Sequence, residues 1–371
     1  TLPNFQAEID ETVDFMELFA TQFGPYPFAD EKYGHCMAPI GGGMEHQTMT
    51  TQGFFEKTLT AHELAHQWWG NNVTCASWCD IWLNEGFASY SEYLMLAALY
   101  PGQQVNHMTQ VHQNVMSQAG GSVWVLDSLN EARIFNGRLS YDKGAGIIHS
   151  LRYLIQNDGL FFGALQDFQN TFADSTATGL DFKNHVANYC NIDLDSYFEQ
   201  WYFGEGFPTY QVKYNQVGTD LILEISHTVS MPNVTPTFTN PVTLKLSRQG
   251  QSDTLVRFAI TSNSEFFTIS NYGTLVGTIG IDPSNWLING NAGVSFDPTL
   301  SVKEEGMDQK VALLPYPNPS SDFIQILQQQ ESITYELYAA NGKLLQAESL
   351  APGQKIDVRM LKKGSYILFV I

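Results

Sequence analysis

The chain has 371 residues, enough for two or three domains with substantial hydrophobic cores. Its 18 basic residues stand against 38 acidic ones, and the resulting formal net charge of −20 makes nucleic acid and anionic membrane surfaces poor partners. No apolar run approaches the length of a membrane span. Only 15% of the residues are charged, while Asn, Gln, Ser and Thr are abundant, which fits an extracellular protein.

The first forty residues predict one helix and one strand. The sequence begins at Thr1 without a signal peptide, so we expect a processed or truncated form. Apolar side chains recur at helical spacing over 7–23, and Gly24-Pro25 ends that pattern. Residues 33–40 are typical of a strand that leads into the glycine-rich stretch 41–46. Glycine-rich backbone of this kind lets a second chain approach closely.

A histidine pair at helical spacing predicts a metal site. His62 and His66 lie one turn apart on the same helix face, so both imidazoles can bind one ion. Glu63 stands beside the first ligand and can reach a water at the metal without ligating the ion. This is the H-E-x-x-H arrangement of zinc hydrolases. Apolar and aromatic neighbours such as Trp68 and Trp69 predict a buried helix, where unpaired imidazoles would be costly.

Two further carboxylates follow on a second predicted helix, over 84–100. Glu85 follows His66 after 18 intervening residues and is the candidate third ligand, with Asn84 as the expected N-cap. Glu92 lies two turns further along the same face. From there it can accept a hydrogen bond from a ligating histidine and fix its tautomer.

Helical patterns continue through 103–118, 147–155, 160–172, 181–190 and 193–203. The period then changes to alternation, which predicts a small antiparallel sandwich over 206–297. Residues 298–312 are a charged linker, and 313–371 form a third unit. That unit contains Asn341-Gly342, a strong hairpin signal, and ends in an apolar strand from Gly364.

Four cysteines, at positions 36, 75, 79 and 190, leave several states open. Two disulfides in one of three pairings are possible, and Cys75 and Cys79 could bridge if their turn is irregular. Buried free thiols are an equally good reading of the same residues. A metal site at this pair is not favoured, because no second pair of cysteines lies near it.

Four separated motifs resemble the M1 family of zinc aminopeptidases, which are gluzincins. They are the histidine pair, the wording Trp-Leu-Asn-Glu-Gly-Phe-Ala around Glu85, the upstream Gly-Gly-Met-Glu at 42–45, and Tyr-x-Lys-Gly from Tyr141. They occur in the family's order and cover roughly residues 15–207. The resemblance implies one zinc ion held by His62, His66 and Glu85.

The resemblance also implies roles for the residues around the metal. Glu63 is the general base, and Tyr141 donates to the oxyanion that forms from the scissile carbonyl. Glu45 captures the free α-amine of a peptide or protein substrate. Gly42, Gly43 and Met44 belong to an edge strand that pairs with the substrate main chain. His46 departs from the family, which usually has Asn at this place.

The third unit resembles a C-terminal sorting domain read by the type IX secretion system. The resemblance rests on the Pro-Asn-Pro start near residue 317 and the Gly-x-Tyr-x-Leu wording from Gly364. It implies export by that secretion machinery and a secreted or cell-surface location. A generic β-sandwich appendage is the alternative.

The expected fold class is α+β. We expect a mainly helical, thermolysin-like gluzincin catalytic domain over 1–205 with a small edge sheet, followed by two small all-β sandwich domains. Relative to full members of the family, we expect a β-rich domain before residue 1 and a large helical domain after the sandwich to be missing. The predicted activity is hydrolysis of the N-terminal peptide bond. A secreted zinc endopeptidase and a non-catalytic peptide-binding homologue are the alternatives.

Overall fold

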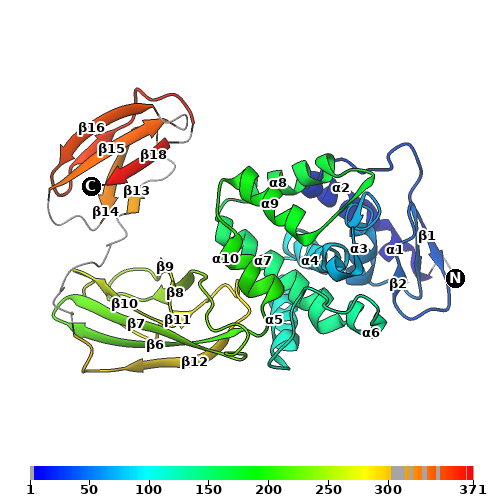
Figure 1. Ribbon diagram of the computed structural model, residues 1–371, viewed down its shortest axis with the longest axis horizontal. Coiled ribbons are helices and arrows are strands. Elements are labelled where there is room, and N and C mark those ends of the chain that lie inside the picture. The colour runs from blue at the N-terminus through cyan, green and yellow to red at the C-terminus, as the bar shows by residue number, and fades with distance from the viewer. Residues whose placement is uncertain are drawn as a thin grey trace. The chain divides into compact units, whose positions relative to one another are not determined.

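The computed structural model describes residues 4–301, 314–316, 321–327, 332–339, 343–364 and 366–370. These residues fall into two compact units, Thr1–Leu300 and Ser301–Ile371. The first unit contains a helical part followed by a β-sandwich, and the regular elements among the described residues of the second are strands (Figure 1). The predicted mixture of helices and small sheets is confirmed.

The helical part of the first unit is built around α4, which carries Glu85 and packs against α3 and α7. A stack of aromatic rings fills its centre, where Trp69 and Phe87 lie with ring centroids 3.7 Å apart. The helices are α1 (Gln6–Asp10), α2 (Thr12–Phe23), α3 (Lys57–Ala65), α4 (Trp82–Leu99), α5 (Gln103–Met116), α6 (Glu131–Ile134), α7 (Gly144–Ile155), α8 (Asp158–Thr171), α9 (Gly179–Cys190) and α10 (Asp195–Phe198). Two π-helices, η3 (Gly137–Lys143) and η4 (Glu199–Phe203), and the 3₁₀ turn η2 (Trp78–Asp80) complete it.

The structure corrects two details of the predicted helices. The helix expected over 7–23 is divided into α1 and α2, with Glu11 between them at helical backbone angles. Asn84 is not an N-cap, because the turn η2 leads through Ile81 into a helix that already begins at Trp82. The Asn84 amide instead accepts from the Cys75 backbone N–H at 3.1 Å and donates to Thr74 Oγ1 at 3.2 Å.

A small sheet lies beside α3. Its strands are β1 (Gly34–Met37), β2 (Gly43–Met44) and β3 (Met49–Gln52), in the order β1-β3-β2. The strand β2 is therefore an edge strand, and it contacts α3. A second short pair, β4 (Val73–Cys75) with β5 (Ser175–Ala177), is parallel.

The sandwich of the first unit has two sheets, β10-β7-β6-β12 and β11-β8-β9. The strands are β6 (Pro208–Val217), β7 (Asp220–Val229), β8 (Val242–Leu246), β9 (Thr254–Phe258), β10 (Ser264–Ile269), β11 (Gly280–Ile281) and β12 (Gly290–Phe296). The prediction of purely antiparallel pairing is wrong for β12, which pairs with β6 in parallel. This last strand returns to the sheet edge beside β6 instead of closing a hairpin.

The sandwich packs on the helical part through polar and aromatic contacts. Tyr153 on α7 bonds to Thr243 Oγ1 at 2.6 Å, and Arg257 donates to the Tyr153 carbonyl at 2.7 Å. The indole of Trp286 stacks on the His149 ring with centroids 4.4 Å apart. These contacts place both parts in one compact unit.

The second unit contains two three-stranded sheets, β13-β14-β17 and β16-β15-β18. Their strands are β13 (Leu314–Tyr316), β14 (Phe323–Leu327), β15 (Ile333–Ala339), β16 (Leu344–Leu350), β17 (Lys355–Asp357) and β18 (Tyr366–Val370). Strands β15 and β16 pair antiparallel on either side of the predicted Asn341-Gly342 turn. That turn, the residues 317–320 and most of the predicted linker lie outside the described residues.

The structure contains four free thiols, at Cys36, Cys75, Cys79 and Cys190. It therefore favours the unpaired state over the disulfides that the sequence left open. Within the described ranges, none of the helices combines the length and the apolar character needed to cross a bilayer.

Candidate active site

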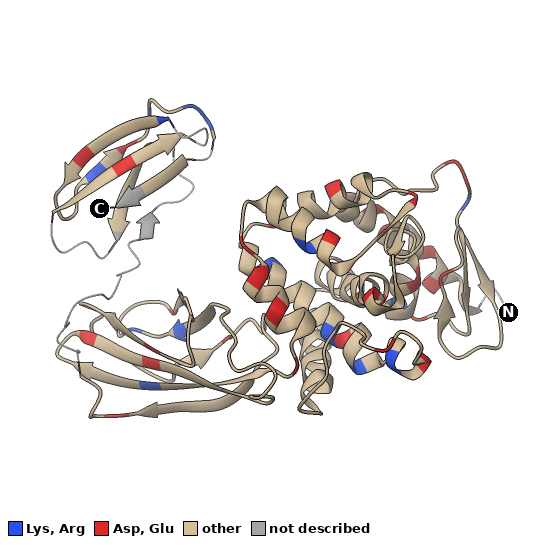
Figure 2. Ribbon diagram, viewed as in Figure 1, with Lys and Arg blue, Asp and Glu red and all other residues tan. Residues whose placement is uncertain are grey.

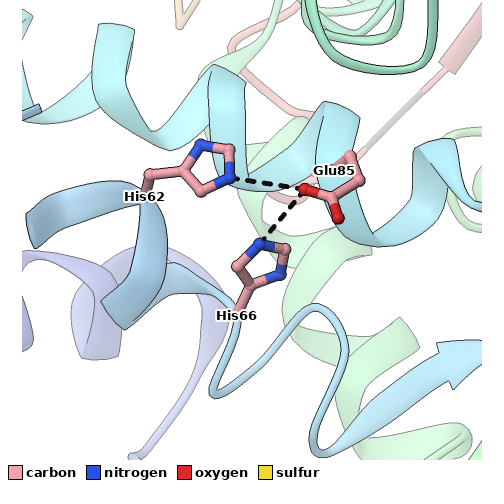
Figure 3. Close-up of side chains that lie close together, drawn as sticks. All are labelled: His62, His66 and Glu85. Carbon is pink, nitrogen blue, oxygen red and sulfur yellow. Dashed lines mark hydrogen bonds and ion pairs between the residues drawn. The ribbon is translucent and has the colours of Figure 1, made fainter. Parts of the chain in front are cut away.

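Three predicted ligands converge at the contact of α3 and α4. Glu85 Oε2 lies 3.4 Å from His62 Nε2 and 3.3 Å from His66 Nε2 (Figure 3). All three side chains are buried. A zinc ion held tetrahedrally at about 2.0–2.1 Å keeps its ligand atoms about 3.4 Å apart. Both the donor set and the spacing therefore fit zinc.

The second nitrogen of each histidine is already engaged. His62 Nδ1 lies 2.8 Å from Glu92 Oε1, and His66 Nδ1 lies 2.9 Å from the Trp69 carbonyl. An Nδ1–H that donates to these oxygens leaves Nε2 of each ring free to face Glu85. Glu92 thus lies where the sequence predicts it. The Trp69 carbonyl was missed, because a backbone oxygen leaves no signal in a motif.

The electrostatics of the cluster favour a bound cation. Burial opposes the charge of Glu85, but His66 and His62 outweigh this effect and hold the pKa of the Glu85 carboxyl well below its usual range. Burial likewise opposes an imidazolium at His62, yet Glu85 and Glu92 raise the pKa of His62 well above its ordinary value. The three side chains therefore stabilise positive charge between them, which a bound divalent ion would supply.

Glu63 lies beside this cluster without a partner for one of its oxygens. Its side chain is 5% exposed, and Oε2 has no hydrogen-bond partner within the described chain. Burial raises the pKa of this carboxyl. The backbone of Gly43 approaches so closely that a Cβ there would lie 2.5 Å from the Glu63 carboxylate. Only glycine lets β2 approach this side chain.

Tyr141 overhangs the cluster from the π-helix η3. Its ring stacks on the His62 imidazole, with centroids 5.9 Å apart and planes 12° from parallel. Burial and the nearby Glu85 carboxylate raise the pKa of the Tyr141 phenol, so the hydroxyl keeps its proton and can donate it in a hydrogen bond. π-Helical turns occur frequently at functional sites.

Glu45 closes the other side of the site. One carboxylate oxygen of Glu45 lies within 4.8 Å of ligand atoms of both Glu63 and His66. The Glu45 carbonyl accepts from Asn71 Nδ2 at 2.9 Å, which ties the end of the edge strand to the loop after α3. The neighbouring His46 is exposed and bonds to Thr51 Oγ1 through Nδ1 at 3.1 Å.

All of the sequence-predicted site residues line one cavity of about 1020 Å³. Its described lining includes five carboxylates and contains neither Lys nor Arg. Sequence reasoning missed several residues of this lining, namely Phe54, Glu56, Trp78 and Phe135. The rings of Trp78 and Phe135 lie edge to face with their centroids 5.8 Å apart, although the two residues are 57 positions apart in the chain. Only the fold brings this pair together.

Two segments of the chain match models of known protein families. Residues 44–201 match the peptidase family M1 domain. This range contains the three predicted metal ligands and Tyr141. Residues 44–201 form an M1 peptidase domain. The predicted resemblance to M1 metallopeptidases is thereby confirmed. Residues 315–371 match the secretion system C-terminal sorting domain, which confirms the second predicted resemblance.

Relatives of the M1 domain are aminopeptidases. Aminopeptidase N of Bos taurus is 35% identical over 205 residues, which cover 47% of this chain and 20% of that protein. Aminopeptidase Ey of Gallus gallus is 27% identical over 275 residues, covering 68% of this chain and 26% of that protein. The chain thus spans about a fifth to a quarter of the length of these relatives.

A solved structure extends the likeness beyond the M1 domain itself. Aminopeptidase A of Legionella pneumophila, solved in complex with aspartic acid, superposes with a TM-score of 0.62 at 15% identity. The match covers 78% of this chain and 35% of that one. At this identity it shows a shared fold, and the coverage reaches past the M1 domain into further residues of the chain.

Proposed function

We propose that this protein is a zinc-dependent aminopeptidase that hydrolyses the N-terminal peptide bond of peptides. The observation that carries the proposal is the convergence of three ligand atoms beside the unpartnered carboxylate of Glu63. The M1 relatives, which are aminopeptidases, support the same reading. We retain the predicted division into 1–205, 206–297, 298–312 and 313–371 as part of the proposal.

One zinc ion would be held by His62, His66 and Glu85. When bound, such an ion acts as a Lewis acid on a carbonyl and lowers the pKa of water. Glu92 and the Trp69 carbonyl hold the two imidazoles in the tautomer that presents Nε2. The remaining chemistry falls to groups of the chain itself.

Glu63 is the proton carrier of the proposed reaction. Its free oxygen accepts a proton from the attacking water and passes it to the nitrogen of the leaving amine. Tyr141 keeps its hydroxyl proton and donates a hydrogen bond to the oxyanion derived from the scissile carbonyl. In the same step, Glu63 takes up the proton that the water releases, and Tyr141 stabilises the negative charge that forms on the carbonyl oxygen.

Glu45 would set the register of cleavage by binding the substrate ammonium. The distance between Glu45 and the Glu63–His66 pair, under 4.8 Å, leaves room for a single residue before the scissile bond. Gly42, Gly43 and Met44 present the free edge of β2 to the substrate main chain, as in strand addition. The carboxylate-rich lining favours a cationic terminus and disfavours acidic side chains.

The second unit supports export. We propose that residues 313–371 are read by the type IX secretion machinery, which would deliver the enzyme to the medium or the cell surface. Peptides with a free N-terminus, present outside the cell, would then be its substrates. The net charge of −20 makes nucleic acid a poor partner.

The proposal is tested by hydrolysis of a short peptide with a free N-terminus. Removal of zinc by a chelator should abolish cleavage, and added zinc should restore it. Glu63→Gln should lower kcat about 10²- to 10⁴-fold at unchanged zinc content. Glu131→Gln, at an exposed glutamate on α6, is the matched control and should cleave normally. Full activity of Glu63→Gln would exclude the proposed proton carrier.

A further inference from the structure

Three basic side chains near the Tyr141 segment bond to backbone carbonyls. Arg133 Nη2 donates to the carbonyls of Ser122 and Trp124, at 2.6 and 3.2 Å. Arg138 donates to the carbonyls of Val115 and Gly120, at 3.1 and 2.9 Å. The chain has only 18 basic residues, and several of those drawn in the helical part lie around α6 (Figure 2). The concentration of cations here calls for an explanation.

Lys143 is the most deeply buried of the three. Its side chain is 1% exposed, and Nζ donates to the carbonyls of Gly121 at 2.8 Å and Gly204 at 3.2 Å. Burial lowers the pKa of this amine, and the neighbouring Arg138 lowers it further. A buried lysine is costly unless its protons are bonded and its charge is compensated.

Glu205 provides that compensation and joins the same network. Its carboxylate attracts Lys143 and Arg133, and Oε2 accepts from the Gly121 backbone N–H at 2.8 Å. The Glu205 backbone N–H donates to Thr235 Oγ1 at 2.8 Å, in the segment between β7 and β8 of the sandwich. Lys143, the last residue of η3, is thereby joined to Gly204 and Glu205, which lie just before the sandwich.

Tyr141 stands two residues before Lys143 on η3. π-Helical segments are rare and mostly a single turn long. We therefore expect contacts from outside η3 to hold it in place. An oxyanion donor needs its position fixed to within about 0.5 Å. On the C-terminal side of Tyr141, Lys143 donates to the Gly121 carbonyl, and the Gly121 N–H donates to Glu205.

We propose that Lys143 is a positioning residue that holds the Tyr141 hydroxyl over the metal site by anchoring η3 to Gly121 and Gly204. The sandwich thereby contributes to catalysis without reaching the cavity, because Glu205 bonds to Thr235 of the sandwich. The catalytic consequence rests on the proposed role of Tyr141, whereas the anchoring of η3 does not.

A double-mutant cycle on the full chain tests this. Tyr141→Phe should lower kcat about 10²- to 10³-fold, as expected for loss of an oxyanion donor. Lys143→Met should lower kcat by up to about a hundredfold, with KM unchanged, because it displaces that donor. In the Tyr141→Phe background, Lys143→Met should cost no more than about twofold. Equal fold losses in both backgrounds would overturn the proposal.

A matched control separates positioning from general loosening of the fold. Arg257 also ties the sandwich to the helical part by donating to a backbone carbonyl, that of Tyr153, but it is not part of the Lys143 network. Arg257→Met should leave kcat unchanged even if it lowers the unfolding temperature. A loss of kcat as large as that in Lys143→Met would show that any weakened junction has the same effect, and the proposal would fall.

A readout independent of peptide hydrolysis completes the test. Backbone amides of 137–143 should exchange hydrogen faster in Lys143→Met than in the wild type, and at the wild-type rate in Arg257→Met. If Lys143→Met does not fold, Glu205→Gln replaces it and should show the same pattern, since it weakens the same anchor. If the wild type cleaves no peptide, the aminopeptidase proposal fails, while exchange still decides the anchoring. Unchanged exchange in 137–143 overturns the inference.

Discussion

Gly86 on α4 and Gly144 at the start of α7 meet backbone to backbone. A Cβ on Gly144 would lie 2.9 Å from the Gly86 Cα, and one on Gly86 would lie 3.0 Å from the Gly144 Cα. Gly86 directly follows the proposed ligand Glu85 on α4, and Gly144 begins α7 directly after η3. This contact therefore helps to fix the distance between Glu85 and the segment that carries Tyr141.

Adding one methyl group at this contact should impair both stability and activity. Gly144→Ala is expected to destabilise the fold by about 1–3 kcal/mol, because the atoms in the way are backbone atoms that cannot rotate aside. Urea unfolding measures the loss, and kcat should fall with it as Tyr141 moves away from the metal. Gly137→Ala, at the first residue of the adjacent η3, is the control, because a Cβ there meets nothing within 4 Å. Equal stability of the two variants would contradict the packing argument.

Loss of the Glu92 carboxylate should weaken the metal site without removing a ligand. Glu92→Gln no longer offers a charged acceptor to His62 Nδ1, a contact now 2.8 Å long. Zinc affinity should fall about 10- to 100-fold, the usual effect of removing such a partner. Competition with a chromophoric chelator measures it, with Glu131→Gln as the control. A zinc dissociation constant equal to that of the wild type would show that Glu92 does not orient His62.

Much of the metal site was predictable from sequence because its geometry is local. The spacing of His62 and His66 fixes their shared face through the helical repeat, and Glu85 follows in a recognisable motif. The expected N-cap at Asn84 was wrong, since the preceding 3₁₀ turn starts the helix earlier. Capping depends on backbone angles that a preference for Asn does not determine.

The supporting contacts could not be predicted, because they join distant segments. Lys143 bonds to Gly121 and Gly204, which lie 22 and 61 positions away in the chain. A lysine in sequence is usually a solvated side chain, so nothing marks this one as buried. The parallel return of β12 beside β6 is likewise a matter of topology, which alternation alone does not reveal.

Neutralising Glu45 should affect substrates with a free N-terminus selectively. Glu45→Gln removes the charge that would bind the substrate ammonium. We expect kcat/KM for a free peptide to fall roughly ten- to a hundredfold, as for loss of one charged hydrogen bond. Most of the change should appear in KM, because the ammonium is bound before and during the reaction. Steady-state kinetics over a range of peptide concentrations checks this. An unchanged KM would remove Glu45 from substrate binding.

Acid should weaken the junction between the helical part and the sandwich. Burial lowers the pKa of His112, which bonds to Asn285 Oδ1, from 6.5 to about 4. Between pH 6.5 and 4 the unfolded chain binds a proton there that the folded chain does not. The free energy of unfolding therefore falls as the pH is lowered through this window, by up to about 3 kcal/mol for this residue. Burial and the neighbouring His112 also lower the pKa of His149. His149 therefore contributes further to the loss of stability in acid.

Urea unfolding at several pH values between 4 and 7 measures this dependence. His112→Gln keeps a polar side chain at the position but cannot take up a proton there, so its stability should decline less steeply with acid. The exposed His46→Gln serves as the control and should keep the wild-type slope. A slope that His112→Gln leaves unaltered would exclude His112 as a source of the acid sensitivity.

If this protein is an aminopeptidase, a peptide with a blocked N-terminus should resist it. One short peptide is offered to the zinc-loaded protein in two forms, with a free and with an acetylated N-terminus, and the products are identified by mass. We expect release of the first residue from the free peptide and no cleavage of the acetylated one. Equal internal cleavage of both forms would contradict it and make the protein an endopeptidase.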